Sequence, residues 1–410
     1  MTVTAPTKPV PHGFDAAAAI ASARRATIAD RYAIDSFAVE WRALAGLAAI
    51  EDEWRALAAR ALVPNVFYEP GFALAAAPLF GRDAGAVLVW SGPSPRRLVG
   101  FFPAHVVRRR YGLKLPLLVG WIHPFAPLGV PLVEREAAEP VIAAWLAHLA
   151  GNAALPGLLL LPFMPEDGPF AEALAAILRR GRMPSAAFNR HSRALLAPDS
   201  NRTGYVERAL GARKYREVCR TVRRLHEAGA VLFTTATEPD AITRALDDFL
   251  ALEAGGWKGA AGTAAASSED TRSFVSAAVA ALAAEHKAAI DRIMLDGRAA
   301  AAAITLRSGD TAWFWKIAYD EDMARFSPGV LLTALVTERL ADDATLEHAD
   351  SCATADHAVM NRTWSERLTL HDLLIAVKPQ APFARAMRLE HMRGTAIDAA
   401  KRLRGLLRRR

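Results

Sequence analysis

Cysteine is almost absent from this chain: only Cys219 and Cys352 occur among its 410 residues. Two cysteines cannot build a disulfide framework or a cysteine-rich zinc site, and they suit a reducing compartment. Long hydrophobic runs are absent too. The best candidate, residues 158–163, contains a proline and is far shorter than the roughly 18–20 residues that cross a membrane. We therefore expect a cytoplasmic protein.

Several common chemical motifs are also absent. The sequence has no Walker phosphate loop, no glycine-rich nucleotide fingerprint after a predicted strand and no helical His-Glu metal motif. His348, Cys352 and His357 are spaced unlike any familiar zinc site, so we expect no metal.

Acidic residues are too few to balance the basic ones: 50 Lys and Arg face 43 Asp and Glu, which gives a net charge of +7. Most of the excess lies at the end of the chain, where residues 387–410 hold eight Lys or Arg against Glu390 and Asp398. Because the rest is nearly neutral, a nucleic acid partner is not favoured. The basic C-terminal tail, 381–410, is either solvated or a peripheral contact with an anionic membrane or a partner.

The order of predicted elements indicates the fold class. With 52% hydrophobic and 23% charged residues, the chain is a globular protein long enough for two or three domains. The second half has the periodicities of a strand, two helices, three strands, a helix, a strand, a short helix and a last strand, and the first half has a similar order. We predict an α/β (α+β) protein with two tandem related lobes, each a mixed sheet flanked by helices.

The predicted boundaries divide the chain into five parts: a flexible lead-in at 1–30, an N-terminal lobe at 31–200, a basic connecting helix at 201–230, a C-terminal lobe at 231–380 and the tail at 381–410. The connecting helix is amphipathic with Arg and Lys on its polar faces. It is either a solvated connection or a surface that faces an anionic substrate or cofactor.

Three stretches of the second half carry a family resemblance: FWKIAYDEDMARFSPGVLL from Phe314, LEAGGWKGAAGT from Leu252 and DSCATADHAVMNRTWSERL from Asp350. They resemble CelD-type acetyltransferases associated with cellulose biosynthesis, which are GNAT N-acyltransferases related to the double-GNAT Fem peptidyltransferases. The resemblance covers about residues 202–378. It implies transfer of an acyl group from acetyl-CoA or another acyl-CoA to an amine acceptor of unknown identity.

The resemblance also implies a binding site for acyl-CoA. Strand 311–320 would be the splayed strand whose backbone bonds the pantetheine amides, and the following helix would point its N-terminus at the pyrophosphate. A simple loop-to-helix transition is the other interpretation of the Ser-Pro-Gly segment. The cofactor-binding residues expected on this basis are Lys316, Ile317, Ala318, Arg325, Ser327, Gly329 and Val330.

The predicted substrate side consists of Trp257 and Lys258 in a glycine-rich loop, together with Trp315. The loop is either an acceptor lid or an ordinary connection. On a regular strand Trp315 points opposite to both Phe314 and Lys316, and such aromatic side chains most often belong to a core. A buried Lys316 needs a partner or water, because an unpaired buried charge is costly.

Three residues are candidates for the chemistry. Tyr319 ends the predicted strand, where the resemblance implies a proton donor to the leaving thiolate. Asp350 or His357 would take the proton of the amine, directly or through water. The alternatives are helix capping by Asp356 beside a surface His357, and a covalent role for Cys352. Two further functions stay open: aminoacyl transfer from charged tRNA, and a non-catalytic accessory role in polysaccharide synthesis.

Overall fold

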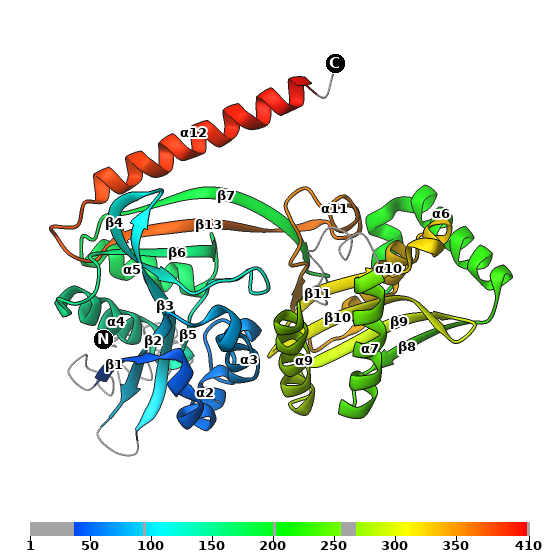
Figure 1. Cartoon of the computed structure of the whole chain (residues 1–410), viewed down its shortest axis with the longest axis horizontal. Coiled ribbons are helices and arrows are strands. Elements are labelled where there is room, and N and C mark those ends of the chain that lie inside the picture. Colours follow the sequence, from blue (N-terminus) through cyan, green and yellow to red (C-terminus); the bar gives the residue numbers. More distant parts are fainter. Residues whose placement is uncertain (1–36, 93–95, 200–201, 256–267, 408–410) are drawn as a thin grey trace, which may run out of the picture.

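A computed structural model describes residues 37–92, 96–199, 202–255 and 268–407; the predicted lead-in lies outside them. The described residues form one mixed sheet of 13 strands flanked by helices, which confirms the predicted fold class (Figure 1). The secondary structure of the first half is β1 (Phe37–Ala43), η2 (Leu44–Ile50), α2 (Glu51–Ala58), η3 (Val66–Tyr68), α3 (Pro70–Phe80), β2 (Ala84–Ser91), β3 (Arg97–Arg110), β4 (Leu113–Gly120), β5 (Leu132–Val133), η4 (Arg135–Ala137), α4 (Ala138–Gly151), β6 (Leu158–Pro165), α5 (Pro169–Arg180) and β7 (Ser185–Leu196).

The second half begins with α6, which is kinked at Gly211 (φ 74°). Its elements are α6 (Tyr205–Ala228), β8 (Val231–Ala236), α7 (Pro239–Gly255), α9 (Glu269–Ala284), β9 (Ala288–Leu295), β10 (Arg298–Ser308), β11 (Thr311–Tyr319), η6 (Glu321–Phe326), α10 (Pro328–Asp342), β12 (His348–Asp350), α11 (Ala358–Thr363), β13 (Glu366–Ala376) and α12 (Phe383–Leu407).

Local sequence accounts for several of these boundaries. The Asp-Gly pair at Asp296–Gly297 forms the turn between β9 and β10 and has positive φ at both residues, which is the geometry of a tight two-residue hairpin turn. Ser268 caps α9 by accepting a hydrogen bond from the Thr271 amide at 3.1 Å, a role that serine side chains favour. The segment 321–326 between β11 and α10 is the 3₁₀ helix η6, and Asp320 caps it by accepting a hydrogen bond from the Asp322 amide at 3.0 Å.

The two halves share a central ribbon. Twelve strands run in the order β1-β2-β3-β4-β6-β13-β7-β12-β11-β10-β9-β8, and the short β5 pairs with β3 beside this row. Strand β13 comes last in the chain, yet it lies between β6 and β7 of the first half and is antiparallel to both. Strand β7 in turn reaches β12 of the second half through Leu195 and Leu196. Figure 1 shows these two long strands running across both parts of the sheet.

A common core also joins the halves. One cluster of buried side chains extends from Trp54 and Phe101 in the first half to Phe249 and Trp313 in the second. Helix α3 packs against α9, and the Phe72 ring lies with its centroid 5.6 Å from that of Phe274. A second cluster lies on the other face of the second half, under α6 and α10.

Residues 383–407, predicted as part of a basic tail, form the helix α12. Its first turns pack on the sheet through Ala386, and its far end projects from the body of the molecule (Figure 1). Among the described residues, no helix is both long and apolar enough to cross a membrane.

Candidate active site

The sheet opens between β11 and β12. Strand β11 pairs with β10 along its whole length, but it pairs with β12 only from Thr311 to Trp313. Beyond that point β12 ends at Asp350, and the rest of β11 lines a pocket of about 660 Å³. The predicted residues that line this pocket are Trp315, Lys316, Ile317, Ala318, Tyr319, Ser327, Gly329, Val330 and His357.

A β-bulge changes the direction of one predicted side chain. Thr305 of β10 is opposite Phe314, and the next residue, Ile304, is opposite Lys316, so that Trp315 is the extra residue. Trp315 packs on the core face opposite to Phe314, as expected. Lys316, however, lies on the same face as Trp315, so the prediction that the two side chains point in opposite directions was wrong. The bulge breaks the strict alternation of a regular strand.

Lys316 finds its counter-charge in this position. Its Nζ lies 3.6 Å from Oε1 of the buried Glu253 on α7 and 4.4 Å from the ring centroid of Phe125. A carboxylate and an aromatic face both stabilise a partly buried ammonium group. The Trp315 indole donates a hydrogen bond to the Phe125 carbonyl at 2.9 Å, so the first half of the chain helps to form this wall.

The start of α10 forms one end of the pocket. Ser327 is the N-cap residue of α10, with Pro328 directly after it; its backbone angles are left-handed (φ 47°, ψ 51°), and its side chain makes no capping hydrogen bond. Its carbonyl accepts from the Val330 and Leu331 amides instead. The first amides of a helix lack intrahelical acceptors, and its dipole favours anions there.

Gly329 has a steric reason to be glycine. A Cβ atom at this position would lie 2.8 Å from Cδ1 of the Tyr319 ring. The tyrosine ring at the end of β11 therefore lies directly against the first turn of α10. Arg325 does not line the pocket; it is exposed on η6, with its guanidinium 4.7 Å from the Phe326 ring centroid.

Asp350 faces away from the pocket. It is buried, and its carboxylate pairs with the guanidinium of Arg193, which is also buried and lies on β7. Its other oxygen accepts a hydrogen bond from the Cys352 amide at 3.0 Å. This arrangement does not favour Asp350 as a base; it shapes the loop 351–354, which does line the pocket.

His357 caps α11, a role that the sequence had suggested for Asp356. The His357 Nδ1 accepts from the Met360 amide at 3.2 Å. A neutral ring that accepts at Nδ1 carries its proton at Nε2. In this conformation His357 is suited to donate a hydrogen bond to a ligand in the pocket, and it must leave its cap to remove a proton at Nδ1.

Burial raises the pKa of the Cys352 thiol well above its ordinary value, with the nearby Asp350 charge adding to the effect. A thiol held in its protonated form is a poor nucleophile. Trp257 and Lys258 lie outside the described residues. The described part of the chain contains no group of three or more His, Cys, Asp or Glu side chains that could hold a metal ion.

The corresponding opening of the first half is filled. Strands β4 and β6 also pair in parallel over only two residues, but the loop after β4 packs into the gap. A Cβ at Gly129 would lie 2.0 Å from the Pro162 carbonyl oxygen, so the loop touches the backbone of β6. The segment 127–133 ends in the short strand β5.

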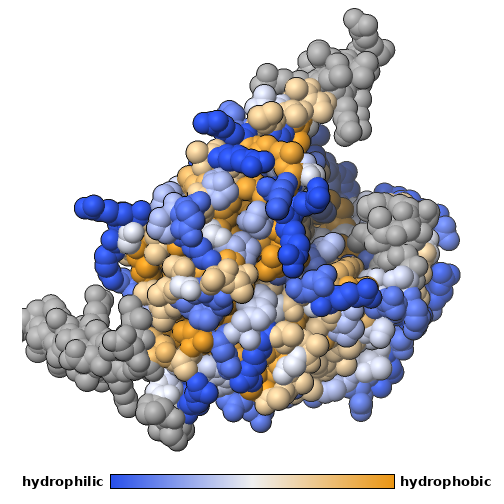
Figure 2. All heavy atoms as spheres, turned by 60° about the vertical axis from the view of Figure 1, so that its left-hand side comes forward, coloured by the Kyte–Doolittle hydropathy of each residue, from blue (hydrophilic) through white to orange (hydrophobic). Residues whose placement is uncertain are grey.

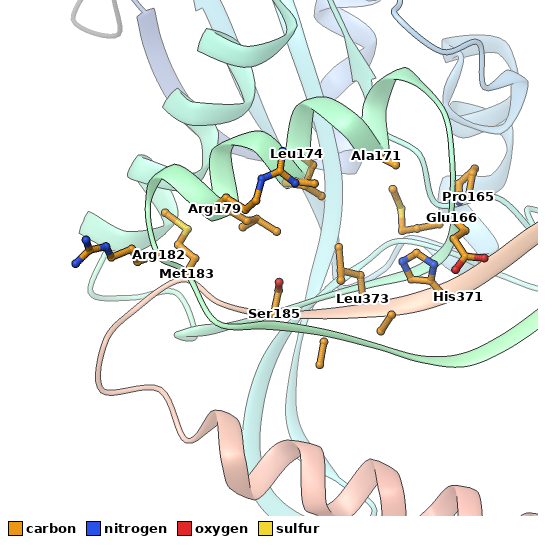
Figure 3. A pocket seen from close by; sticks show the side chains of 15 residues that line it. Pro165, Glu166, Ala171, Leu174, Arg179, Arg182, Met183, Ser185, His371 and Leu373 are labelled. Atoms are coloured by element: carbon orange, nitrogen blue, oxygen red, sulfur yellow. The ribbon is translucent and has the colours of Figure 1, made fainter.

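A second pocket, of about 510 Å³, lies between α5 and the β7–β13 ribbon (Figure 3). Leu174, Leu373 and other apolar side chains form most of it, with Glu166 and His371 close together at one end. Burial lowers the pKa of His371.

A mixed sheet flanked by helices, in which β11 extends past its short parallel partner β12 toward the start of α10, is a GNAT acyltransferase-like fold. In agreement, residues 212–376 match the family described as "Acetyltransferase (GNAT) domain". No curated protein is similar enough in sequence to count as a match.

Two solved structures share the fold at low identity. One is the C-terminal domain of a putative lysylphosphatidylglycerol synthetase from Agrobacterium fabrum, with 12% identity, a TM-score of 0.52, and coverage of 83% of this chain and 94% of that one. The other is FemX, with 10% identity, a TM-score of 0.55, and coverage of 80% and 95%.

Proposed function

We propose that this protein is an acyl-CoA-dependent N-acyltransferase that transfers an acyl group, in the simplest case acetyl, to an amine of a small molecule, a sugar or a cell-envelope or polysaccharide precursor. One observation carries the proposal: beyond Trp313 the edge of β11 leaves β12 and lines a pocket that ends at the start of α10. The reaction would take place in the cytoplasm. The narrower CelD-type resemblance stays a prediction.

The donor would lie along β11. Backbone groups of Lys316, Ile317 and Ala318 would bond the pantetheine amides, as an additional strand does at a sheet edge. The pyrophosphate would lie at the start of α10 beside Ser327 and Gly329, where first-turn amides and the helix dipole favour an anion. Val330 would contact the same ligand, and the exposed Arg325 is near enough in sequence to meet its outer phosphates.

The chemistry would depend chiefly on positioning. A neutral amine attacks the thioester carbonyl carbon, the C–S bond breaks, and the phenol of Tyr319 protonates the leaving thiolate. His357 would donate a hydrogen bond from Nε2 to the acceptor, while the proton of the amine leaves to water in the open pocket. Trp315, Trp257 and Lys258 would form the acceptor side.

Isothermal titration with acetyl-CoA and longer acyl-CoAs tests the proposal. We expect dissociation constants below about 1 mM, the value at which binding becomes negligible in such a site. Ser327→Asp places a negative charge at the helix start and should abolish binding, whereas the uncharged Ser327→Asn of similar size should retain it. Equal affinity of the two variants would remove the helix start from the site, and no binding of any acyl-CoA would overturn the function.

A second candidate is aminoacyl transfer from charged tRNA. Helix α6 carries exposed basic side chains, and two of them lie 3.7–3.8 Å from the carboxylate of Glu217. These exposed basic residues are Arg213, Lys214, Arg216 and Arg220. Titration with aminoacyl-tRNA separates this candidate, because it predicts tight, strongly salt-dependent binding and no acyl-CoA affinity. An accessory protein would bind neither ligand.

A further inference from the structure

The hairpin between β3 and β4 carries an unusual turn. Its two central residues, Tyr111 and Gly112, have φ values of 50° and 78°. Such turns prefer Asn-Gly, because a bulky side chain is strained at positive φ. The turn is flanked by exposed cations on both strands, Arg108 and Arg109 on one side and Lys114 on the other.

Contacts with α12 explain the tyrosine. The Tyr111 hydroxyl donates to Glu390 at 2.7 Å, and the Arg110 Nε donates to the other oxygen of the same carboxylate at 2.8 Å. The guanidinium of Arg393, one turn along the helix, lies 5.3 Å from the Tyr111 ring centroid. Glu390 is buried, so these contacts fix α12 on the hairpin.

The same contacts leave a surface whose net charge is positive. Within the hairpin tip 108–114 and the helix segment 383–397, Glu390 is the single acidic residue, and Arg110 neutralises it. The remaining cations are exposed: Arg108, Arg109, Lys114, Arg385, Arg388 and Arg393. The sequence adds more Lys and Arg between leucines after residue 400.

Exposed apolar side chains lie among these cations. Met392 is 67% exposed, and Tyr111 and Leu113 are 44% and 42% exposed. Figure 2 shows hydrophobic residues next to hydrophilic ones on the face below the projecting helix. Cations alone suit any polyanion, whereas cations interspersed with apolar side chains suit the headgroup and upper acyl region of a bilayer.

We propose that the β3–β4 hairpin tip and α12 together form a binding surface for a membrane of anionic phospholipids. The cations meet the negative headgroups, and Leu113, Tyr111 and Met392 enter the interface. This inference is independent of the acyl-CoA pocket, which lies in the second half of the chain.

Sedimentation of the full-length protein with vesicles tests the proposal. We expect binding to vesicles made of equal parts phosphatidylcholine and phosphatidylglycerol, no binding to phosphatidylcholine alone, and weaker binding as salt rises. The triple charge reversal of Arg108, Arg109 and Lys114 to Glu should lower the bound fraction at limiting lipid at least about tenfold. The matched reversal of Arg213, Arg216 and Arg220 on α6 changes the net charge equally and should leave binding unchanged.

A second variant, Leu113→Ser with Met392→Ser, keeps every charge and should weaken binding most at high salt, where the apolar contribution dominates. Circular dichroism of each variant establishes that it is folded. Failure of the wild-type protein to bind anionic vesicles would overturn the proposal. An equal loss of vesicle binding in the α6 variant would also overturn it. So would binding to a duplex RNA that is tighter than binding to vesicles at the same salt, if the hairpin reversal abolishes that RNA binding.

Discussion

The buried pair of Arg193 and Asp350 offers a sharp test of how the candidate site is built. Both residues are 2% exposed. One guanidinium nitrogen of Arg193 pairs with Asp350, and another donates to the Pro127 carbonyl at 2.9 Å. The pair therefore joins β7 and a loop of the first half to the end of β12, immediately before the loop that lines the pocket.

Arg193→Met removes the cation and leaves a buried carboxylate with the Cys352 amide as its remaining donor. Removing one partner of a buried ion pair costs about 3–5 kcal/mol of unfolding free energy, because the other charge stays desolvated. Asp350→Leu in the same chain removes that charge. The double variant should therefore recover most of the lost unfolding free energy. It should stay about 1 kcal/mol below the wild type, because the hydrogen bond from the Cys352 amide is also removed.

Urea unfolding followed by tryptophan fluorescence measures these free energies. The matched control is Arg180→Met, which breaks the exposed pair with Glu139 and should cost no more than about 1 kcal/mol. A cost for Arg193→Met no larger than that of the control, or a double variant as unstable as the single one, would contradict a stabilising role of the buried pair. Titration with acetyl-CoA should also show weaker binding for Arg193→Met than for Arg180→Met.

Three further predictions concern single positions. Gly329→Ala places a methyl group against the Tyr319 ring and should weaken acyl-CoA binding about tenfold in calorimetry, whereas Gly46→Ala, in open space, should not; equal affinities would contradict the close approach. Burial lowers the pKa of His123 to about 3, below its ordinary 6.5. Between these two pH values His123 is therefore protonated in the unfolded state and neutral in the folded state. Unfolding free energy should fall by about 1.4 kcal/mol per pH unit in that window, and His123→Phe should reduce the slope measured by urea unfolding. Cys352→Ser should retain initial acyl-transfer rates, since a protonated thiol is not the nucleophile; complete loss in a folded variant would contradict this.

Local signals predicted much of the second half. The alternating residues of β9, β10 and β11, the turn at Asp296–Gly297 and the cap at Ser268 each depend on neighbours within a few residues. Because the interactions that determine them are local, the pattern of residues along the chain was enough. The clustering of Lys316 to Tyr319 with Ser327 and Gly329 was expected from the family resemblance, and local patterns alone did not predict it.

The features that the sequence did not predict depend on residues that are distant along the chain. The bulge at Trp315 depends on how β10 meets β11, and no turn or glycine marks it. Nothing in the local sequence around Arg193 indicates an ion pair. Its pairing with Asp350 depends on the contact between β7 and β12, which are distant in the sequence. Its place at the end of a strand made Asp350 a candidate base. A carboxylate at the end of a strand can equally pair with a buried arginine from another part of the chain, as Asp350 does with Arg193.

The position of β13 has a consequence for biosynthesis. Leu373 of β13 is opposite Leu161 of β6 and close to Ala187 of β7, although about two hundred residues of chain separate β13 from those strands. A nascent chain that has emerged only as far as β12 therefore holds two strands with the one between them missing. Pairing over such separations is slow, and unpaired strand edges are prone to aggregate. The sheet is complete only after β13 has left the ribosome, so β6 and β7 gain their shared neighbour late in synthesis.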